Sequence, residues 1–254
     1  MLPALNIGGL VLPTAPLTFI LGAWLALSLV ERAAARVYST HAERVYHLAT
    51  IGLVAGIIGA RLVFVSSHWS AYQENWLGII WPINTGFHVW SGLAIGVAAA
   101  FFYGRFQQLD PAITLDALAP GLIIGLMAIS LADFLAGPGF GTLSNLPWAI
   151  SIFGLRRHPV QIYELLIGLA ALALWWRSSQ QPSFTGQIFL TTISLYSGGR
   201  LLVDAFRDNA PLTAGGYHII QIISLTVLLT SLFLISQNVT AGHETRSRSG
   251  STEH

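Results

Sequence analysis

Two short stretches of this sequence carry polar side chains that could bind or transfer a charged group. The first runs from His158 to Glu164, includes Gln161 and Tyr163, and opens an apolar run. Placing an ionisable side chain at the edge of a bilayer costs free energy unless the side chain pairs with another polar group. Such a residue therefore marks a candidate functional site. His158 is a candidate proton acceptor, because imidazole exchanges protons near neutral pH. The spacing predicts that His158, Gln161 and Glu164 share one face of a helix with Pro159 in its first turn.

The second stretch places three charges, Arg200, Asp204 and Arg207, at spacings of four and three residues, which predicts one helical face. One interpretation is an ion pair that neutralises itself. The other is an anion site, in which the guanidinium groups bind a phosphate and Asp204 orients them. Arg61 is another arginine within a predicted span, and it directly follows two small residues. It is a further candidate for binding an anion, although small residues also serve helix packing. Asp133 either pairs with one of these arginines or takes part in the chemistry.

The composition places these residues in a membrane protein. The chain has 254 residues, of which 54% are hydrophobic and 9% are charged, whereas a soluble domain has about 25% charged residues. The absence of cysteine excludes a disulfide framework, a thiol nucleophile and a cysteine-ligated metal. A net charge of +1 gives no sign of a nucleic-acid partner.

The elements that must position the polar residues are membrane-spanning helices, each of which needs about 20 apolar residues. The sequence predicts an all-α integral membrane protein with about seven spans, a single membrane domain over residues 1–239 and a disordered cytoplasmic tail over residues 240–254. The predicted spans are 14–34, 46–67, 87–105, 113–135, 159–177, 184–206 and 216–236.

The distribution of arginine predicts the orientation of these spans. Seven arginines fall on one side (Arg32, Arg36, Arg44, Arg105, Arg177, Arg246 and Arg248) and three on the other (Arg156, Arg157 and Arg207). The excess of positive charge in cytoplasmic loops then puts the N-terminus outside and the C-terminus inside. All the embedded charges come to lie near the outer leaflet. This favours a site that opens to the outer membrane face over an ion pathway through the membrane.

The stretch His158-Pro-Val-Gln-Ile-Tyr-Glu164 resembles the start of the fifth span of the bacterial prolipoprotein diacylglyceryl transferases. Further elements of that family have counterparts here in the same order, over roughly residues 50 to 230. They are Gly59-Ala60-Arg61-Leu62, Leu146-Pro147-Trp148-Ala149, the set Arg200, Asp204 and Arg207, and Gln221. The family topology is also similar to the one predicted here.

The sequence departs from the family pattern in the third and fourth spans. Trp90 stands where the family has a histidine, and His88 lies two residues earlier, about 200° around a helix. In the fourth span Ser130 stands where the family has arginine, and Asp133 and Ala136 stand where it has asparagine. These departures affect phosphate stabilisation and proton handling.

The resemblance implies transfer of a diacylglyceryl group from phosphatidylglycerol to the lipobox cysteine thiol of a prolipoprotein, with release of glycerol phosphate. It implies no metal and no soluble cofactor. By the same resemblance, Arg200 and Arg61 hold the lipid phosphate, Asp204 and Glu164 orient the arginines, and His158 accepts the proton. The expected catalytic residues are Arg200, His158, Glu164 and Asp204, and the expected substrate-binding residues are Arg61, Gln161, Tyr163, Arg207 and Asp133.

We expect a multi-pass monomer in the bacterial plasma (inner) membrane, with phosphatidylglycerol and prolipoprotein lipobox peptides as partners. Two alternatives remain open. One is a relative of the same fold that binds lipid or lipoprotein but catalyses poorly or acts on another lipid. The other is a small membrane transporter, against which the one-sided clustering of charges argues.

Overall fold

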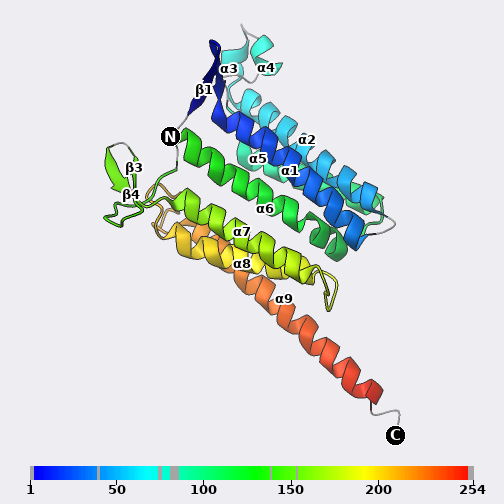
Figure 1. Cartoon of the computed structure of the whole chain (residues 1–254). Helices are drawn as coiled ribbons and strands as arrows, with labels where there is room; N and C mark the ends of the chain where they lie inside the picture. The colour runs from blue at the N-terminus through cyan, green and yellow to red at the C-terminus, as the bar shows by residue number, and fades with distance from the viewer. Residues whose placement is uncertain are drawn as a thin grey trace. The chain divides into compact units, whose positions relative to one another are not determined.

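The computed structural model describes residues 3–38, 41–73, 76–80, 86–137, 139–152 and 154–250, and it is mostly helical (Figure 1). The helices are α1 (Thr14–Val37), α2 (Ala42–Ser67), α3 (Trp69–Tyr72), α4 (Leu77–Ile80), α5 (Val89–Phe106), α6 (Pro111–Ala136), α7 (Val160–Ser178), α8 (Gln187–Asp204) and α9 (Ile219–Gly250). Two antiparallel hairpins pair β1 (Ala4–Ile7) with β2 (Leu10–Pro13) and β3 (Ile150–Ile152) with β4 (Leu155–Arg157).

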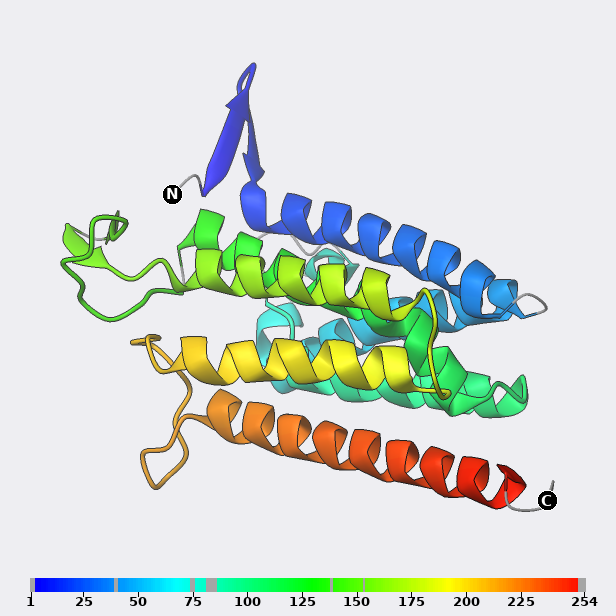
Figure 2. The same ribbon diagram turned by 60° about the horizontal axis from the view of Figure 1, so that its bottom comes forward.

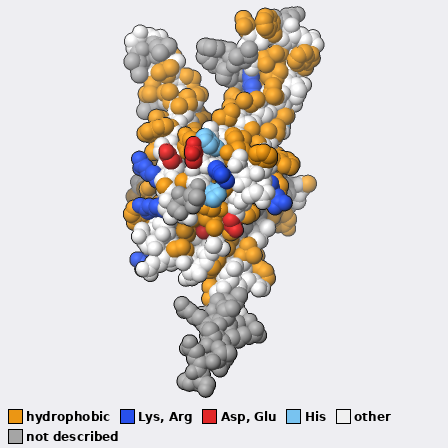
Figure 3. Space-filling view, turned by 90° about the vertical axis from the view of Figure 1, so that its right-hand side faces the viewer, with side chains coloured by type: hydrophobic (Ala, Val, Ile, Leu, Met, Phe, Trp, Pro, Cys, Tyr) orange, Lys and Arg blue, Asp and Glu red, His pale blue; other side chains and the backbone are white. Residues whose placement is uncertain are grey.

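The prediction of an all-helical membrane protein is confirmed in its main feature. Six of the described helices, α1, α2, α5, α6, α7 and α9, are long and apolar enough to cross a membrane. The helix α8, the remaining predicted span, is less apolar because it carries Arg200 and Asp204 and several hydroxyl side chains. Large hydrophobic side chains such as Ile20, Trp24 and Phe102 are exposed. Hydrophobic side chains, drawn in orange, also cover much of the face that Figure 3 shows. Such a surface suits lipid rather than water.

The end of α9 differs from the sequence prediction. The sequence predicts disorder from residue 240, whereas the backbone of α9 stays helical to Gly250. No proline interrupts residues 241–250, so every backbone amide can continue the helical hydrogen-bond ladder. Residues 251–254 lie outside the described part of the chain.

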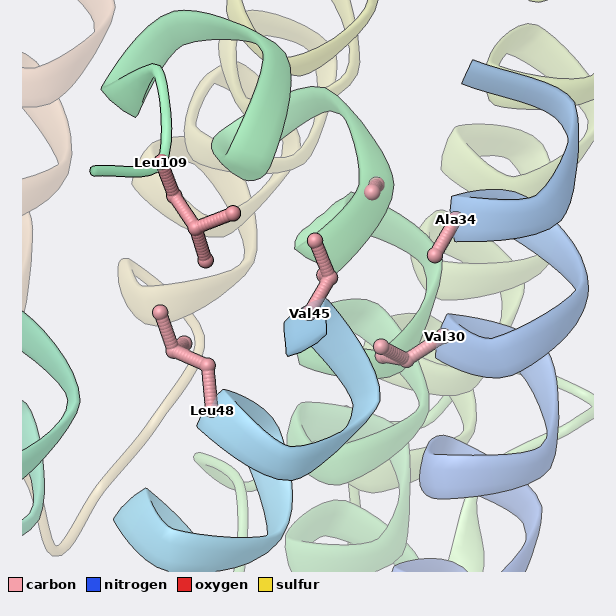
Figure 4. Packing of buried hydrophobic residues seen from close by; sticks show 6 residues of the cluster. Val30, Ala34, Val45, Leu48 and Leu109 are labelled. Carbon is pink, nitrogen blue, oxygen red and sulfur yellow. The ribbon is translucent and has the colours of Figure 1, made fainter. Parts of the chain in front are cut away.

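The chain divides into two compact units: unit 1 comprises Met1–Leu29 and Ala119–His254, and unit 2 comprises Val30–Leu118. In unit 2, α2 and α5 pack backbone to backbone through glycines at positions 52, 56, 92 and 96. A Cβ added at Gly92 would lie 2.5 Å from the Cβ of Ala60, so only glycine permits this approach. Buried side chains from α1, α2 and the α5–α6 connection complete its core, and Figure 4 shows Val30, Val45 and Leu109 among them.

In unit 1, α8 packs between α7 and α9, and the three lie side by side in Figures 1 and 2. The core between α6, α7 and α8 contains Ile123, Ala171 and Tyr196. The hydroxyl groups of Ser194 on α8 and Ser231 on α9 share a hydrogen bond of 2.7 Å. Such polar links join helices where the surrounding lipid offers no hydrogen-bond partner. The division into units leaves the predicted single membrane domain over residues 1–239 a prediction.

Candidate active site

Glu164 is the buried carboxylate around which the polar residues of unit 1 gather. It lies in the second turn of α7, and 2% of its side chain is exposed. Arg200 of α8 forms an ion pair with Oε1, Arg207 donates from Nη2 to the same oxygen at 2.6 Å, and Ser130 of α6 donates to Oε2 at 2.6 Å. One carboxylate therefore binds donors from three separate segments, as a buried charge requires.

Arg207 reaches Glu164 from beyond the end of α8. The sequence predicts one helical face for Arg200, Asp204 and Arg207, but α8 ends at Asp204. A turn follows, in which the backbone N–H of Arg207 donates to the carbonyl oxygen of Asp204 at 3.1 Å. Arg207 then forms an isolated antiparallel bridge with Gly141. The predicted shared face is therefore wrong for Arg207, because the helix ends before it, and loop pairing brings it to the site.

A short ladder of backbone hydrogen bonds holds Arg207 in place. The N–H of Thr142 donates to the carbonyl oxygen of Phe206 at 2.8 Å, and the N–H of His158 donates to that of Thr142 at 3.0 Å. Segment 140–143 thus runs between segments 156–158 and 206–208, and we call this arrangement the loop ladder. A Cβ at Gly141 would lie 2.4 Å from the carbonyl oxygen of His158, so a larger residue cannot enter without displacing a strand of the ladder.

Arg157 supports the loop ladder through its side chain. It donates from Nη1 to the carbonyl oxygen of Gly141 at 3.0 Å and to Oδ2 of Asp208 at 2.7 Å. Its guanidinium group also lies 4.7 Å from the ring centroid of Phe140. In the sequence Arg157 stands out only as a loop charge, because no local spacing signals partners 16 and 51 residues away.

Asp204 forms a second buried centre next to the first. Its side chain has no exposed surface, Oδ2 lies 3.0 Å from Nδ1 of His218, and Oδ1 lies 4.0 Å from Nη2 of Arg200. His218 precedes α9 and is absent from the residues that the sequence singles out. A histidine in a loop carries no signal of its own, and 14 residues separate it from Asp204.

Asp133 completes the polar group, since its Oδ2 lies 3.9 Å from Nη1 of Arg207. We call Ser130, Asp133, Glu164, Arg200, Asp204 and Arg207 the Glu164 cluster. Its two arginines face three carboxylates, which leaves one net negative charge when all of them are ionised. The arginines therefore compensate most, but not all, of the buried negative charge.

A cavity of about 400 Å³ in unit 1 joins the Glu164 cluster to an apolar slot. Its polar end is lined by Ser130, Asp133, Glu164, Arg200 and Arg207. Its apolar part includes Leu126 and Ile129 of α6, Ile193 of α8, and Ile223 and Val227 of α9. The size and the single charged end fit part of an amphipathic ligand, since binding cavities are mostly apolar with a few convergent polar groups.

His158 does not share a helical face with Glu164. The helix α7 begins at Val160, and Pro159 caps it in a non-helical conformation, so His158 lies in the preceding extended segment. Its Nδ1 lies 3.3 Å from the hydroxyl oxygen of Tyr163, and its ring lies 4.9 Å from that of Phe206. Trp148, in turn, donates from Nε1 to the Tyr163 hydroxyl at 2.8 Å. The predicted face is wrong because the helix starts two residues later than it requires.

Gln161 is on the expected helix and fully buried. It donates from Nε2 to the carbonyl oxygen of Gly139, and its Oε1 has no hydrogen-bond partner among the described residues. A Cβ at Gly139 would lie within 3.4 Å of Asp133, Gln161 and Arg207. Gln161 thus fixes the segment that covers the Glu164 cluster. The described cavity lining includes neither Gln161 nor His158 and Tyr163.

Arg61 belongs to unit 2, where it is buried among backbone oxygens and aromatic rings. It donates to the carbonyl oxygens of Gly78, Ile79 and Gly86, with distances of 3.1 Å to Ile79 and 3.0 Å to Gly86. Its guanidinium carbon lies 5.4 Å from the ring centroid of Tyr72. These contacts tie Arg61 of α2 to α4 and to Gly86. The joint role with Arg200 in one cavity stays a prediction.

A family comparison decides the class of the protein. Residues 3–237 match the family described as prolipoprotein diacylglyceryl transferase. The chain belongs to this family. The family resemblance seen in the sequence is therefore confirmed, and the match extends beyond residues 50 to 230 toward both ends of the chain.

Individual relatives in this family are similar over most of their length. The phosphatidylglycerol–prolipoprotein diacylglyceryl transferase of Clostridioides difficile (strain 630) is 29% identical over 185 residues, which cover 72% of this chain and 73% of that protein. The enzyme of the same name from Enterococcus faecalis is 26% identical over 228 residues, 84% of this chain and 82% of the relative. That from Bordetella avium is 33% identical over 189 residues, 70% of this chain and 71% of the relative.

Proposed function

We propose that this protein transfers a diacylglyceryl group from phosphatidylglycerol to the cysteine thiol of prolipoproteins, and that the Glu164 cavity holds the lipid. The observation that carries this proposal is an apolar slot that ends at two arginines bound to one buried carboxylate. Acyl chains suit the slot, and the phosphodiester suits the arginines, which bind phosphate through directed N–H groups.

The arginines can bind a phosphate without releasing Glu164. Nε of Arg207 is buried and has no hydrogen-bond partner among the described residues. Nη1 of Arg207 lies 3.9 Å from Asp133, and Nη2 of Arg200 lies 4.0 Å from Asp204, so both are beyond hydrogen-bond distance of those carboxylates. In this proposal Glu164 acts as the orienting group, and the N–H groups that it leaves unbound donate to the phosphate.

In the transfer reaction, the guanidinium groups of Arg200 and Arg207 stabilise the leaving phosphate. The cysteine thiol loses its proton, because the thiolate is the nucleophile. Its sulfur forms a bond to the carbon of the diacylglyceryl group that is joined to the phosphate. The bond between this carbon and the phosphate oxygen breaks. The electron pair stays on the phosphate oxygen, and glycerol phosphate leaves. Pre-oriented cationic donors stabilise this developing charge, and a single donor of this kind is worth about 3–4 kcal/mol of barrier.

The other expected residues take supporting roles in this proposal. The Tyr163 hydroxyl accepts a hydrogen bond from the indole of Trp148 and contacts His158, and Gln161 fixes the segment at Gly139. Arg61 ties α2 to α4 and to Gly86. We place the cavity toward the outer leaflet of the bacterial plasma membrane, where the arginine distribution puts the start of α7. The protein acts as a monomer in this proposal.

The charge of the Glu164 cluster supports one alternative. Two arginines and three carboxylates carry a net negative charge, which repels an anionic lipid unless one carboxylate loses its charge. A specialised relative would bind a lipid or lipoprotein in the same cavity and transfer no diacylglyceryl group. The experiment below separates this alternative from the enzyme.

The test supplies the purified protein with phosphatidylglycerol and a lipobox peptide and detects the thioether-linked lipid by mass. We expect product from the wild-type protein and at least about a hundredfold less from Arg200→Lys, because an ammonium group cannot replace the fixed fork of a guanidinium group. Arg177→Lys is the matched control, because Arg177 is exposed and lies at the end of α7 opposite to Glu164. We expect this variant to keep wild-type activity.

Two outcomes would contradict the proposal in different ways. A wild-type protein that yields no thioether but binds phosphatidylglycerol, with binding lost in Arg200→Ala, would favour the specialised relative. An Arg200→Lys variant that transfers as fast as Arg177→Lys would mean that the reaction takes place at another site.

A further inference from the structure

The pair of Asp204 and His218 is the part of unit 1 that the proposed reaction has not used. Asp204 has no exposed side-chain surface, whereas 26% of the His218 side chain is exposed. Nδ1 of His218 lies 3.0 Å from Oδ2 of Asp204. An ionised carboxylate can only accept a hydrogen bond, so Nδ1 carries the proton and donates it. The other ring nitrogen, Nε2, is then left as an acceptor.

The backbone places His218 next to residues that line the substrate cavity, although His218 itself is not among the described lining residues. His218 forms an antiparallel bridge with Leu212, and the N–H of the next residue, Ile219, donates to the carbonyl oxygen of Pro211 at 3.0 Å. Pro211 and Ile220, on the two strands of this bridge, both line the cavity. Arg200, which also lines it, lies 4.0 Å from Asp204. Asp204 therefore lies between the imidazole and Arg200, and the imidazole is partly exposed.

The thiol needs a proton acceptor, and Glu164 and His158 are poorly suited to that role. Glu164 is bound by two arginines and a serine hydroxyl. Neither His158 nor His218 is among the described residues that line the cavity, but the neighbours Pro211 and Ile220 of His218 line it, whereas Tyr163, which His158 faces, does not. Trp90 stands where the family resemblance places a histidine, and its side chain is exposed. His218 combines a ring fixed by Asp204, an Nε2 atom without a hydrogen-bond partner among the described residues, and neighbours that line the cavity.

We propose that His218, oriented by Asp204, takes the proton of the prolipoprotein thiol in this protein. The inference rests on the proposed function and adds a residue to it. The S–H bond breaks, and its proton moves to Nε2 of His218. The sulfur forms a bond to the glycerol carbon, and the phosphate oxygen leaves with the electron pair. The imidazolium gives its proton back to the released glycerol phosphate or to water.

The charged groups around His218 fit this cycle. Asp204 is in direct contact and stabilises the imidazolium that forms. Arg200 lies on the far side of Asp204, and Glu164 neutralises Arg200. Arg207 also binds Glu164 and faces Asp133. The negative charge that the three carboxylates leave uncompensated is therefore balanced while His218 carries the proton.

The decisive variant is His218→Asn, because an asparagine amide can still donate to Asp204 from near the position of Nδ1 but cannot accept a proton. His47→Asn is the matched control, since His47 is a histidine 3.5 Å from an exposed carboxylate, that of Glu43 in unit 2. Thioether formation from phosphatidylglycerol and a lipobox peptide is followed from about pH 6 to about pH 9.5. Far-ultraviolet circular dichroism confirms that both variants fold.

We expect His218→Asn to transfer at least about a hundredfold more slowly than the wild-type protein at pH 6.5, the usual size of a general-base contribution. Above about pH 9 the variant should be only a few-fold slower than the wild-type protein, because the thiol, with a pKa of about 8.5, ionises without a base. His47→Asn should follow the wild-type profile throughout. A purely structural role of His218 would lower the rate by the same factor at every pH.

Three results would overturn the inference. A His218→Asn variant within threefold of the wild-type rate at pH 6.5 would exclude His218 as the acceptor. A deficit that stays constant up to pH 9.5 would assign it a structural role only. A wild-type protein that forms no thioether at any pH would overturn the proposed function and this inference with it.

Discussion

At the scale of single residues, the site depends on one carboxylate that has several donors. Glu164 binds Arg200, Arg207 and Ser130, which come from α8, the loop after it and α6. A buried ion pair contributes little net stability when it forms, but the loss of one member leaves an uncompensated charge. Glu164 therefore matters more to folding than either arginine alone, because its loss frees two cations at once.

The first prediction concerns Glu164→Gln. We expect the free energy of unfolding to fall by about 3–5 kcal/mol, because two buried arginines lose their common counter-charge. The midpoint of denaturation of the purified protein in detergent measures this. Ser130→Ala is the control on the same carboxylate and should cost about 1.5–3 kcal/mol, the value of one hydrogen bond to a charged group. Equal midpoints for the two variants would contradict the central place of Glu164.

The second prediction concerns Asp133→Asn. Asp133 opposes an incoming phosphate, because its Oδ2 lies 3.9 Å from Nη1 of Arg207 at the polar end of the cavity. Removing its charge should tighten the binding of phosphatidylglycerol by roughly tenfold, or about 1.4 kcal/mol. Binding to vesicles that contain phosphatidylglycerol measures the effect, with the exposed Glu43→Gln as control. Weaker binding in Asp133→Asn would show that Asp133 orients Arg207 and does not repel the lipid.

The sequence predicts residues of the site only where their type is unusual for a membrane helix. Glu164, Arg200 and Arg207 stand out because a charge in an apolar run is costly. Ser130 does not stand out, because serine in such helices commonly bonds the carbonyl oxygen one turn back, as Ser130 also does with Leu126 at 3.3 Å. His218 lies in a loop, where histidine is ordinary. Their partners are fixed only by the fold.

At the scale of elements, the α2–α5 pair of unit 2 is held by close backbone contact. A Cβ at Gly92 would lie 2.7 Å from the carbonyl oxygen of Gly56, and one at Gly96 would lie 2.6 Å from that of Gly52. In a membrane, helix association depends on such packing, since lipid is as apolar as leucine. The helices cannot separate slightly without losing contact along the whole seam.

The third prediction tests this seam with Gly92→Ala. The added methyl group meets backbone and cannot be accommodated by a rotamer change, so we expect a loss of about 1–3 kcal/mol. Gly125→Ala on α6 is the matched control, because a Cβ there meets no atom within 4 Å. Denaturation midpoints of both variants give the comparison. A Gly92→Ala protein as stable as Gly125→Ala would mean that the seam is loose.

The helices themselves follow from the sequence, whereas their connections do not. The predicted span 14–34 corresponds to α1 at Thr14–Val37, and 113–135 corresponds to α6 at Pro111–Ala136. Apolar length alone locates such helices. The loop ladder depends on pairs such as Gly141 with Arg207, far apart in the sequence. Short segments of this kind have no periodicity, so nothing local specifies their register.

At the scale of the whole molecule, the orientation in the membrane decides which side the substrates come from. The arginine count predicts that segment 137–157, which precedes α7, lies outside, and that segment 179–186, which follows it, lies in the cytoplasm. Prolipoproteins would then meet the cavity at the outer face. The chain has no cysteine, so single cysteines introduced at chosen positions give an unambiguous readout.

The fourth prediction follows from that orientation. Asn145→Cys should react in intact cells with a maleimide that does not cross the membrane, whereas Ser183→Cys should react only after the cells are permeabilised. Both side chains are exposed, so access to the reagent depends only on the side of the membrane. Labelling measured by a mass shift or a gel shift gives the result. The reverse pattern would place the start of α7, and the cavity with it, on the cytoplasmic side.

The loop ladder has a consequence for the evolution of the protein. Connections between helices usually tolerate insertions and deletions, but here Gly141 pairs with Arg207, and Leu143 pairs with Arg157. A residue gained or lost within 140–143 would shift that register and displace Arg207 from Glu164. The tip of the β3–β4 hairpin at Gly154 lies outside the ladder. We expect length variation among relatives to accumulate at that tip, while the ladder keeps a fixed length, as a helical core segment would.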